Sequence, residues 1–556
     1  MALPLPFICL ALATPLAAQT QGGVFASHNA IDSAVAGSGF GQSLDVIQDV
    51  NLDGTGEVII GAPFEDVVGV SAAGAVHLRG GGGSSFAATF QGTVANGLFG
   101  WSVANAGLCT GDSYEDILVG APGENAAYIF DSFSGAEYLR VTGPNDSAFG
   151  WSVVSLGDLD ADGVDDFAVG APDDSPSDLA QAGSVFVHSG ADGSLLRSFH
   201  GASAGDHFGY AITALKIAPV TAGVSAGSPP RLLVIGAPDT LLGGHVAVFD
   251  ASTGGEIFSA DGSVNTIGSR FGFSLTAVSD ADADGIEELA IGAPYYAPPN
   301  IASFNVGQVT IFSTVANTKL HTITGGGNFN LLGLQLGSAD LDGDGFAELS
   351  VRSYKTGYGH IEIFDGVEST LLWEIEGSPE MAAVGTAMGG GLDLTNDGLP
   401  DLVCGAPLAD TSAGLNAGRV AVYGIHTILS STESSFNSPA GGFLTFQLDF
   451  PATEQFRQYL LLASGGTGPI MQDGVLVPLS NDSFLRRMVG GNPMFPGQQG
   501  QLDISGDAQV VFYVPPHLLD ALIGTSLNFA VVSADGNGVR TSSVAVPVAI
   551  VSASGS

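Results

Sequence analysis

The chain has 556 residues, more than one ordinary domain requires, and its 14 Lys and Arg against 56 Asp and Glu give a formal net charge of −42. This charge argues against nucleic acid as a partner, because phosphate binding requires clustered basic residues, and it favours cation binding. With 45% hydrophobic residues and 81 glycines, the composition excludes disorder and a coiled coil and is typical of short strands joined by tight turns.

The first element is an apolar segment, residues 1–18, which ends in the small residues Ala17 and Ala18. We interpret it as a secretory signal peptide that is cleaved near Gln19. A buried N-terminal strand or helix is the alternative, because no Lys or Arg precedes the apolar run. No later stretch reaches the ~18 apolar residues that a membrane-spanning helix requires. We therefore expect a secreted, extracellular or cell-surface protein with no membrane span.

Residues 22–427 repeat a pattern with a period of 50 to 63 residues. Each copy combines Phe-Gly, a short strand, a loop, an apolar strand, Gly-Ala-Pro and two further strand signals. The seven copies, the last two degenerate, begin at Phe40, Phe99, Phe149, Phe208, Phe271, Leu332 and Val384. Four strands per copy predict an all-β, seven-bladed β-propeller, because a single sheet needs neighbours to bury both faces. An open β-solenoid is the alternative; a closed ring would recruit the strand-like Val24–Ala30 into the last blade.

Five copies carry an acidic loop with oxygen-bearing side chains at positions 1, 3, 5 and 9 and Gly at position 6. The alternate spacing lets side chains of one tight turn converge, and the backbone carbonyl at position 7 adds an oxygen. Hard oxygens without His or Cys select Ca²⁺ over zinc or copper, which predicts up to five Ca²⁺ sites. At positions 1, 3, 5, 7 and 9 of each loop, the predicted ligands are Asp49, Asn51, Asp53, Thr55 and Glu57; Asp158, Asp160, Asp162, Val164 and Asp166; Asp280, Asp282, Asp284, Ile286 and Glu288; Asp340, Asp342, Asp344, Phe346 and Glu348; and Asp393, Thr395, Asp397, Leu399 and Asp401.

Two other interpretations of these loops are possible. An EF-hand requires flanking helices and Glu at position 12, where this chain has apolar residues or Cys404. A set of acidic β-turns that bind nothing is the remaining alternative. Copies two and four lack the ligand set, with Leu108 at position 1 of copy two and Arg231 at position 9 of copy four. We predict no metal in those two loops.

Phe-Gly, Gly-Ala-Pro and the Asp-x-Asp-x-Asp-Gly-x-x-Asp loop together resemble the FG-GAP repeats of the integrin α-subunit N-terminal β-propeller. The resemblance covers residues 22–425 and implies Ca²⁺ in loops on one face and ligand recognition elsewhere on the blades. It carries the calcium role onto the five loops above. Copy six lacks Gly-Ala-Pro, and the acidic loops are scattered over the ring, whereas those of integrins cluster in the later blades. We therefore expect a secreted relative of this family without the leg region or membrane span of an integrin subunit.

After the repeats, we predict a polar linker at 428–442 and a small β-sandwich-like domain at 443–556. Its predicted strands are Phe443–Phe450, Gln458–Ala463, Val510–Val514, Leu527–Val532 and Ser543–Val551.

No catalytic set emerges from the sequence, which has neither HExxH spacing nor a phosphate loop. We therefore predict a non-enzymatic, secreted calcium-binding protein that acts in adhesion or in recognition of an extracellular protein or glycan ligand. One alternative is an extracellular hydrolase or lyase acting on polysaccharide or phospholipid, and another is a structural surface-layer component.

Overall fold

The computed structural model describes residues 24–426 except 82–85, 218–230, 242, 263–267, 299–303, 356 and 397, and beyond residue 426 it describes the strands. The predicted signal peptide, residues 1–18, therefore lies outside the described residues. The chain forms two compact units, one spanning Ser27–Gly424 and the other containing Ile425–Ser556.

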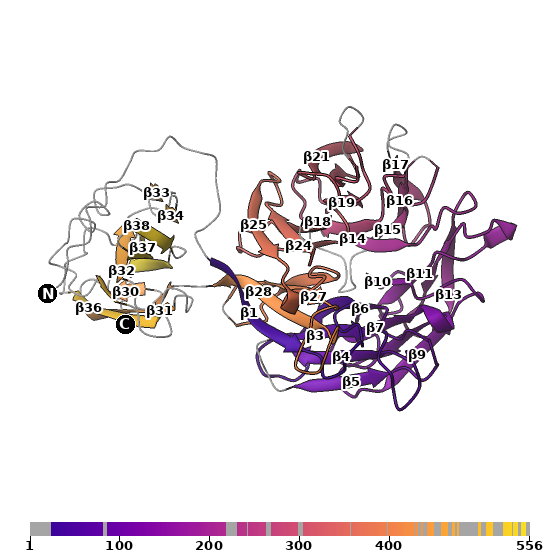
Figure 1. The fold of residues 1–556 in the computed structure, drawn as a ribbon, viewed down its shortest axis with the longest axis horizontal. Coiled ribbons are helices and arrows are strands. Elements are labelled where there is room, and N and C mark those ends of the chain that lie inside the picture. The colour runs from indigo at the N-terminus through magenta and orange to yellow at the C-terminus, as the bar shows by residue number, and fades with distance from the viewer. Residues whose placement is uncertain are drawn as a thin grey trace. The chain divides into compact units, whose positions relative to one another are not determined.

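The larger unit consists of seven four-stranded sheets, one for each copy of the repeat (Figure 1). Blade one contains β2 (Ser43–Ile47), β3 (Glu57–Ala62), β4 (Ala75–Gly80) and β5 (Ala87–Gln91). Blade two contains β6 (Ser102–Gly107), β7 (Asp116–Ala121), β8 (Ala126–Phe130) and β9 (Glu137–Thr142). Blade three contains β10 (Ser152–Gly157), β11 (Asp166–Ala171), β12 (Ser184–His188) and β13 (Leu195–His200). Blade four contains β14 (Ala211–Lys216), β15 (Arg231–Ala237), β16 (His245–Asp250) and β17 (Glu256–Asp261).

The last three blades follow the same order of strands. Blade five contains β18 (Ser274–Val278), β19 (Glu288–Ala293), β20 (Gln308–Ser313) and β21 (Thr318–Thr324). Blade six contains β22 (Leu336–Ala339), β23 (Glu348–Ser353), β24 (His360–Phe364) and β25 (Leu371–Glu376). Blade seven contains β26 (Met388–Leu392), β27 (Asp401–Ala406), β28 (Arg419–His426) and β1 (Val24–Asp32). The described residues also form the short 3₁₀ turns η1 (Pro122–Glu124), η2 (Pro176–Asp178) and η3 (Pro379–Met381).

Burial across each blade explains why the blades need one another. Every residue of the second strand is buried in β3, β7, β11, β19 and β27. The fourth strand is mostly exposed; in β5, for example, only Phe90 is buried. The second strands therefore have both faces covered by adjacent blades, as the apolar runs before Gly-Ala-Pro predict. This confirms the predicted all-β, seven-bladed propeller.

The ring closes through β1, the first strand that the structure describes. β1 pairs with β28, so the last blade is built from both ends of the propeller sequence. The Arg419 guanidinium reinforces this pairing by donating to the Asp32 carboxylate at 2.9 Å. The first strands β2 and β26 also contact each other across the closure. The expectation that the segment 24–30 joins the last blade is confirmed, and the open solenoid is wrong.

The glycine of Gly-Ala-Pro lies at a close backbone approach between adjacent blades. A Cβ atom on Gly120 would lie 2.1 Å from the carbonyl oxygen of Gly150, the Phe-Gly glycine of the next blade. The corresponding contact is 2.1–2.4 Å at Gly61, Gly170, Gly236, Gly292 and Gly405. Blade six is the exception, because Arg352 occupies this position. The two glycine motifs of the repeat therefore meet each other across the blade interface.

We expect the substitution Gly120→Ala to destabilise the propeller by about 1–3 kcal/mol, because its methyl group would overlap a backbone carbonyl that cannot rotate away. Chemical denaturation monitored by circular dichroism measures the free energy of unfolding. Gly327→Ala is the matched control, since a Cβ there meets no atom within 4 Å. Equal stability of the two variants would show that the close approach imposes no steric limit.

The C-terminal unit is built from two main sheets. The three-stranded sheet contains β29 (Leu429–Ser431), β31 (Gly442–Asp449) and β36 (Asp507–Val514). The six-stranded sheet contains β30 (Ser435–Asn437), β39 (Val546–Val551), β37 (Ser526–Asp535), β32 (Gln458–Ser464), β35 (Gln499–Gln501) and β38 (Gly538–Ser542), and β33 (Ile470–Gln472) pairs with β34 (Val475–Val477). The buried rings of Phe446 and Phe529, 4.6 Å apart, join the two main sheets into a sandwich-like core. The segment predicted as a linker, 428–442, contributes β29 and β30 to these sheets. β29 pairs with β31, and β30 pairs with β39.

Candidate functional site

The five acidic loops connect the first strand of a blade to its second strand, and they share one backbone geometry. Gly at position 6 has a φ between 91° and 96° in all five loops, in the left-handed region that favours glycine. Its peptide N–H donates to the position 1 carboxylate at 2.8–3.1 Å. In four of the loops the position 7 N–H donates to the position 5 carboxylate at 2.8–3.0 Å. The predicted reversal at position 6 is therefore present.

Four of the loops bring three carboxylates together. In each, one oxygen from every member lies within 4.8 Å of the other two. The groups are Asp49, Asp53 and Glu57; Asp158, Asp160 and Asp166; Asp280, Asp282 and Glu288; and Asp340, Asp342 and Asp344. Three carboxylates this close repel one another unless a cation or protons neutralise them. Each group could hold a hard metal ion.

The acid at position 9 is the most buried member of the ligand set. It begins the second strand of its blade, and in the five loops it is 0–2% exposed. The peptide N–H of position 2 donates to it at 2.6–3.0 Å in every loop. These residues are Glu57, Asp166, Glu288, Glu348 and Asp401. The position 9 acid therefore holds the loop closed, and in blades one, three and five it also belongs to the group of three carboxylates.

Burial changes the acidity of these groups. Burial, together with the charge of neighbouring loop aspartates, raises the pKa of Glu57 and of Glu288 to about 7. Burial followed by the charge of Asp342 raises the pKa of Glu348 to about 8. Burial also raises the pKa of Asp166 and of Asp342 to about 6. Without a metal, the loops therefore retain protons at pH values where ordinary carboxyls are ionised.

An orphaned oxygen supports the fit of a metal in the loop of blade five. Glu288 is 1% exposed, and its Oε2 atom has no hydrogen-bond partner among the described residues. Its other oxygen, Oε1, accepts from the peptide N–H groups of Ala281 and Asp282 at 3.0 and 3.1 Å. An unsatisfied buried carboxylate oxygen is costly, and a cation held with Asp280 would satisfy it.

The loops of blades one and seven depart from the pattern. In blade one, Asn51 is outside the carboxylate group and its amide nitrogen donates to Glu57. In blade seven, the predicted ligand Asp397 lies outside the described residues. Thr395 is nevertheless placed as a ligand would be, since its hydroxyl oxygen is buried and has no hydrogen-bond partner among the described residues. Asp162, Asp284 and Glu348 lie outside the three-carboxylate groups.

Blade two shows what the position 9 acid does when the other ligands are missing. Asp116 is fully buried and accepts from the peptide N–H groups of Cys109 and Thr110, both at 2.9 Å. Position 1 is Leu108, which is 45% exposed and offers no side-chain oxygen. The sequence interpretation treated the position 9 acid as a ligand only and missed this loop-closing role. In blade four the same position is Arg231, which donates to the Ser155 carbonyl at 3.3 Å.

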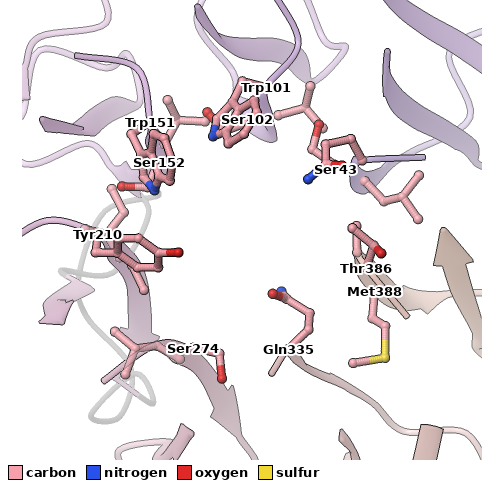
Figure 2. A pocket seen from close by; sticks show the side chains of 18 of the residues that line it. Ser43, Trp101, Ser102, Trp151, Ser152, Tyr210, Ser274, Gln335, Thr386 and Met388 are labelled. Carbon is pink, nitrogen blue, oxygen red and sulfur yellow. The ribbon is translucent and has the colours of Figure 1, made fainter. Parts of the chain in front are cut away.

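A pocket of about 300 Å³ lies where the first strands of all seven blades begin (Figure 2). The sequence interpretation did not identify it, although one signal was present. The residue after Phe-Gly in copies two to five is aromatic, namely Trp101, Trp151, Tyr210 and Phe273. These four side chains line the pocket together. The acidic loops follow the ends of the same first strands, so the loops and the pocket lie on opposite faces of the ring.

Comparison with known proteins agrees with this architecture. The FG-GAP repeat family matches residues 40–78, 149–188 and 384–423, which fall in blades one, three and seven. Integrin alpha-PS2 of Drosophila melanogaster is 34% identical over 170 residues, covering 26% of this chain and 12% of its own. Integrin alpha-5 of Xenopus laevis is 30% identical over 197 residues, covering 32% and 18%. Integrin alpha-IIb of Homo sapiens is 30% identical over 185 residues, covering 30% and 16%.

These matches span less than a fifth of the length of the three integrin subunits. Within the described residues, no helix has the length and apolar character needed to span a bilayer. The blades, their glycine motifs and the sequence matches agree with one another. The chain is a seven-bladed β-propeller that carries FG-GAP repeats and has integrin alpha subunits as homologues.

Proposed function

We propose that this protein is a secreted, calcium-binding recognition propeller that binds an extracellular protein or glycan ligand, in adhesion or ligand capture. The observation that carries the proposal is that four described loops each bring three carboxylates together and that each of these loops has a buried acid at position 9. All-oxygen ligand sets in a flexible loop favour Ca²⁺ over Mg²⁺, which requires a near-ideal octahedron.

The geometry supports different functions for the two faces of the ring. First strands of four to six residues separate the loops from the pocket, a distance of roughly 13–20 Å. Calcium would therefore stabilise the loop face, while the opposite face, which carries the pocket, would meet the ligand. We assign the carbonyls at position 7, those of Thr55, Val164, Ile286, Phe346 and Leu399, to the calcium shells as the resemblance implies.

Isothermal titration calorimetry with Ca²⁺ tests the metal sites. We expect four to five Ca²⁺ per chain for the wild type and one fewer for Asp160→Ala, because the substitution removes the position 3 oxygen from the blade three group. The matched control is Asp112→Ala in the loop of blade two, which should leave the stoichiometry unchanged. Absence of binding at millimolar Ca²⁺, or equal binding of Mg²⁺, would contradict the proposal.

A further inference from the structure

Two chemically different walls enclose the pocket at the start of the first strands. Blades two to five supply an aromatic arc, in which the ring centroids of successive residues are 4.8, 5.5 and 5.1 Å apart. The arc consists of Trp101, Trp151, Tyr210 and Phe273. Blades one, six and seven supply the polar side chains of Gln42, Gln335 and Thr386 beside the apolar Leu44, Ala387 and Met388. A ligand in this pocket therefore meets an apolar surface on one side and hydrogen-bonding groups on another.

The pocket is uncharged in a strongly acidic protein. None of the described residues that line it is Asp, Glu, Lys or Arg, although the chain has a net charge of −42. The nearby Arg270 guanidinium lies over the rings of Phe273 and Tyr295, at 6.0 and 5.3 Å, and pairs with Asp239 at 2.9 Å. A charged ligand would lose its hydration without gaining a counter-ion in the lining. The lining therefore favours a neutral ligand.

Several polar groups of the lining have hydrogen-bonding capacity that no described residue uses. The Tyr210 hydroxyl and the Gln42 amide make no hydrogen bond with any described residue, and the Gln335 amide makes one long bond of 3.4 Å. Figure 2 shows the Tyr210 hydroxyl and the Gln335 amide directed into the hollow. Ser102 and Ser152 donate to glycine carbonyls of the next blade at 2.9 and 2.8 Å, which leaves their oxygens able to accept. A purely apolar ligand would leave these groups unpaired.

We infer that the pocket binds a neutral sugar ring of an extracellular glycan, an inference that rests on the recognition role proposed above. A pyranose ring has a C–H face that packs on an indole and an edge of hydroxyls that both donate and accept hydrogen bonds. The volume of about 300 Å³ is at the small end of ligand pockets, which suits one or two sugar rings. Trp101 and Trp151 bind the face, and Gln42, Gln335 and Tyr210 bind the hydroxyls.

The test uses an array of neutral hexose and N-acetylhexosamine oligosaccharides, followed by fluorescence titration of each sugar that binds. The chain has three tryptophans, two of which line the pocket, so intrinsic emission reports on it. We expect Trp151→Ala and Gln335→Ala each to weaken sugar binding about tenfold, equivalent to one stacking contact or one buried hydrogen bond. Trp373→Phe, on β25 and outside the pocket, is the control and should retain both affinity and the emission change.

Three outcomes would overturn the sugar assignment. These are no binding anywhere on the array, sugar binding that neither pocket variant weakens, and occupation of the pocket by a basic or aromatic peptide in place of sugar. Calcium calorimetry on the same samples separates this inference from the proposed function. Intact calcium binding without sugar binding would reject the sugar assignment alone, and a loss of calcium binding in wild type would reject the proposed function itself. Gln335→Ala keeps the test valid if Trp151→Ala fails to fold, because Gln335 is outside the aromatic arc.

Discussion

Removing calcium is expected to lower the melting temperature of the propeller by of order 10 °C. Each site adds about 1.4–2.7 kcal/mol to the free energy of unfolding when the free Ca²⁺ concentration is about ten to one hundred times the Kd of that site. Four described loops carry a three-carboxylate group, and the contributions of separate blades should add. The loss of metal also restores the repulsion between carboxylates that lie within 4.8 Å of one another.

Differential scanning calorimetry with and without chelator measures this effect. Returning Ca²⁺ should restore the melting temperature, whereas the same concentration of Mg²⁺ should restore only part of it. The variant Asp160→Ala should show a smaller difference between the two conditions, because it has one site fewer. A melting temperature that chelator leaves unchanged would mean that the loops are acidic turns without a metal.

The metal-free propeller is expected to lose stability as the pH rises from about 5 to 8. Burial and neighbouring carboxylates raise the pKa of Glu57 and Glu288 to about 7 and that of Glu348 to about 8, against 4.5 for an ordinary Glu. Between these values the folded state binds more protons than the unfolded state, so the free energy of unfolding falls with rising pH. Below pH 4.5 these carboxyls are protonated in both the folded and the unfolded state, so they no longer make the free energy of unfolding depend on pH.

Melting temperatures across this pH range, in chelator and in Ca²⁺, provide the measurement. In chelator we expect a decrease of roughly 5–10 °C from pH 5 to pH 8. In saturating Ca²⁺ the decrease should be much smaller above pH 7, because the ion takes the place of the protons. Calcium binding near pH 6 should therefore release protons, which calorimetry detects as a dependence of the heat on the buffer. A metal-free protein that becomes more stable towards pH 8 would contradict these pKa shifts.

The blades could be predicted from the sequence because each copy repeats its own local signals. Phe-Gly, an apolar strand and Gly-Ala-Pro recur seven times in full or degenerate form, so the same order of strands is expected in every blade. The reason for the glycines was only partly visible, since the contact between Gly120 and Gly150 joins different copies. The strands β29 and β30 were missed because three-residue strands carry no periodicity of their own.

The acidic loops were predicted as sets of ligands, but their division of roles was not. The spacing alone cannot show that Asp166 accepts the peptide N–H of Leu159 while Asp160 faces Asp158. The first is a hydrogen bond from a backbone N–H to a side-chain carboxylate, and it depends on how the loop meets the strand. Asp116 in blade two makes the same kind of bond without the other ligands, so position 9 serves the fold of the loop in its own right.

The pocket was missed because its parts are far apart in the chain. Each aromatic residue of the pocket follows Phe-Gly in a different copy, namely Trp101, Trp151, Tyr210 and Phe273. In one copy taken alone, such a residue indicates only the start of a strand. Only the closed ring brings them to one place. An alignment of the copies on Phe-Gly shows an aromatic residue at the next position in four consecutive copies.

The pairing of β1 with β28 has a consequence for biosynthesis. Asp32 and Arg419, which bond across this pairing, are 387 positions apart in the chain. At a synthesis rate of about 5–20 residues per second, on the order of 20–80 s separate the emergence of the two residues. Throughout that time β1 has an unpaired edge, a feature prone to association with other chains. β1 leaves the ribosome before the other strands of the propeller and is thus among the last of them to find its partner, so ring closure comes late in folding.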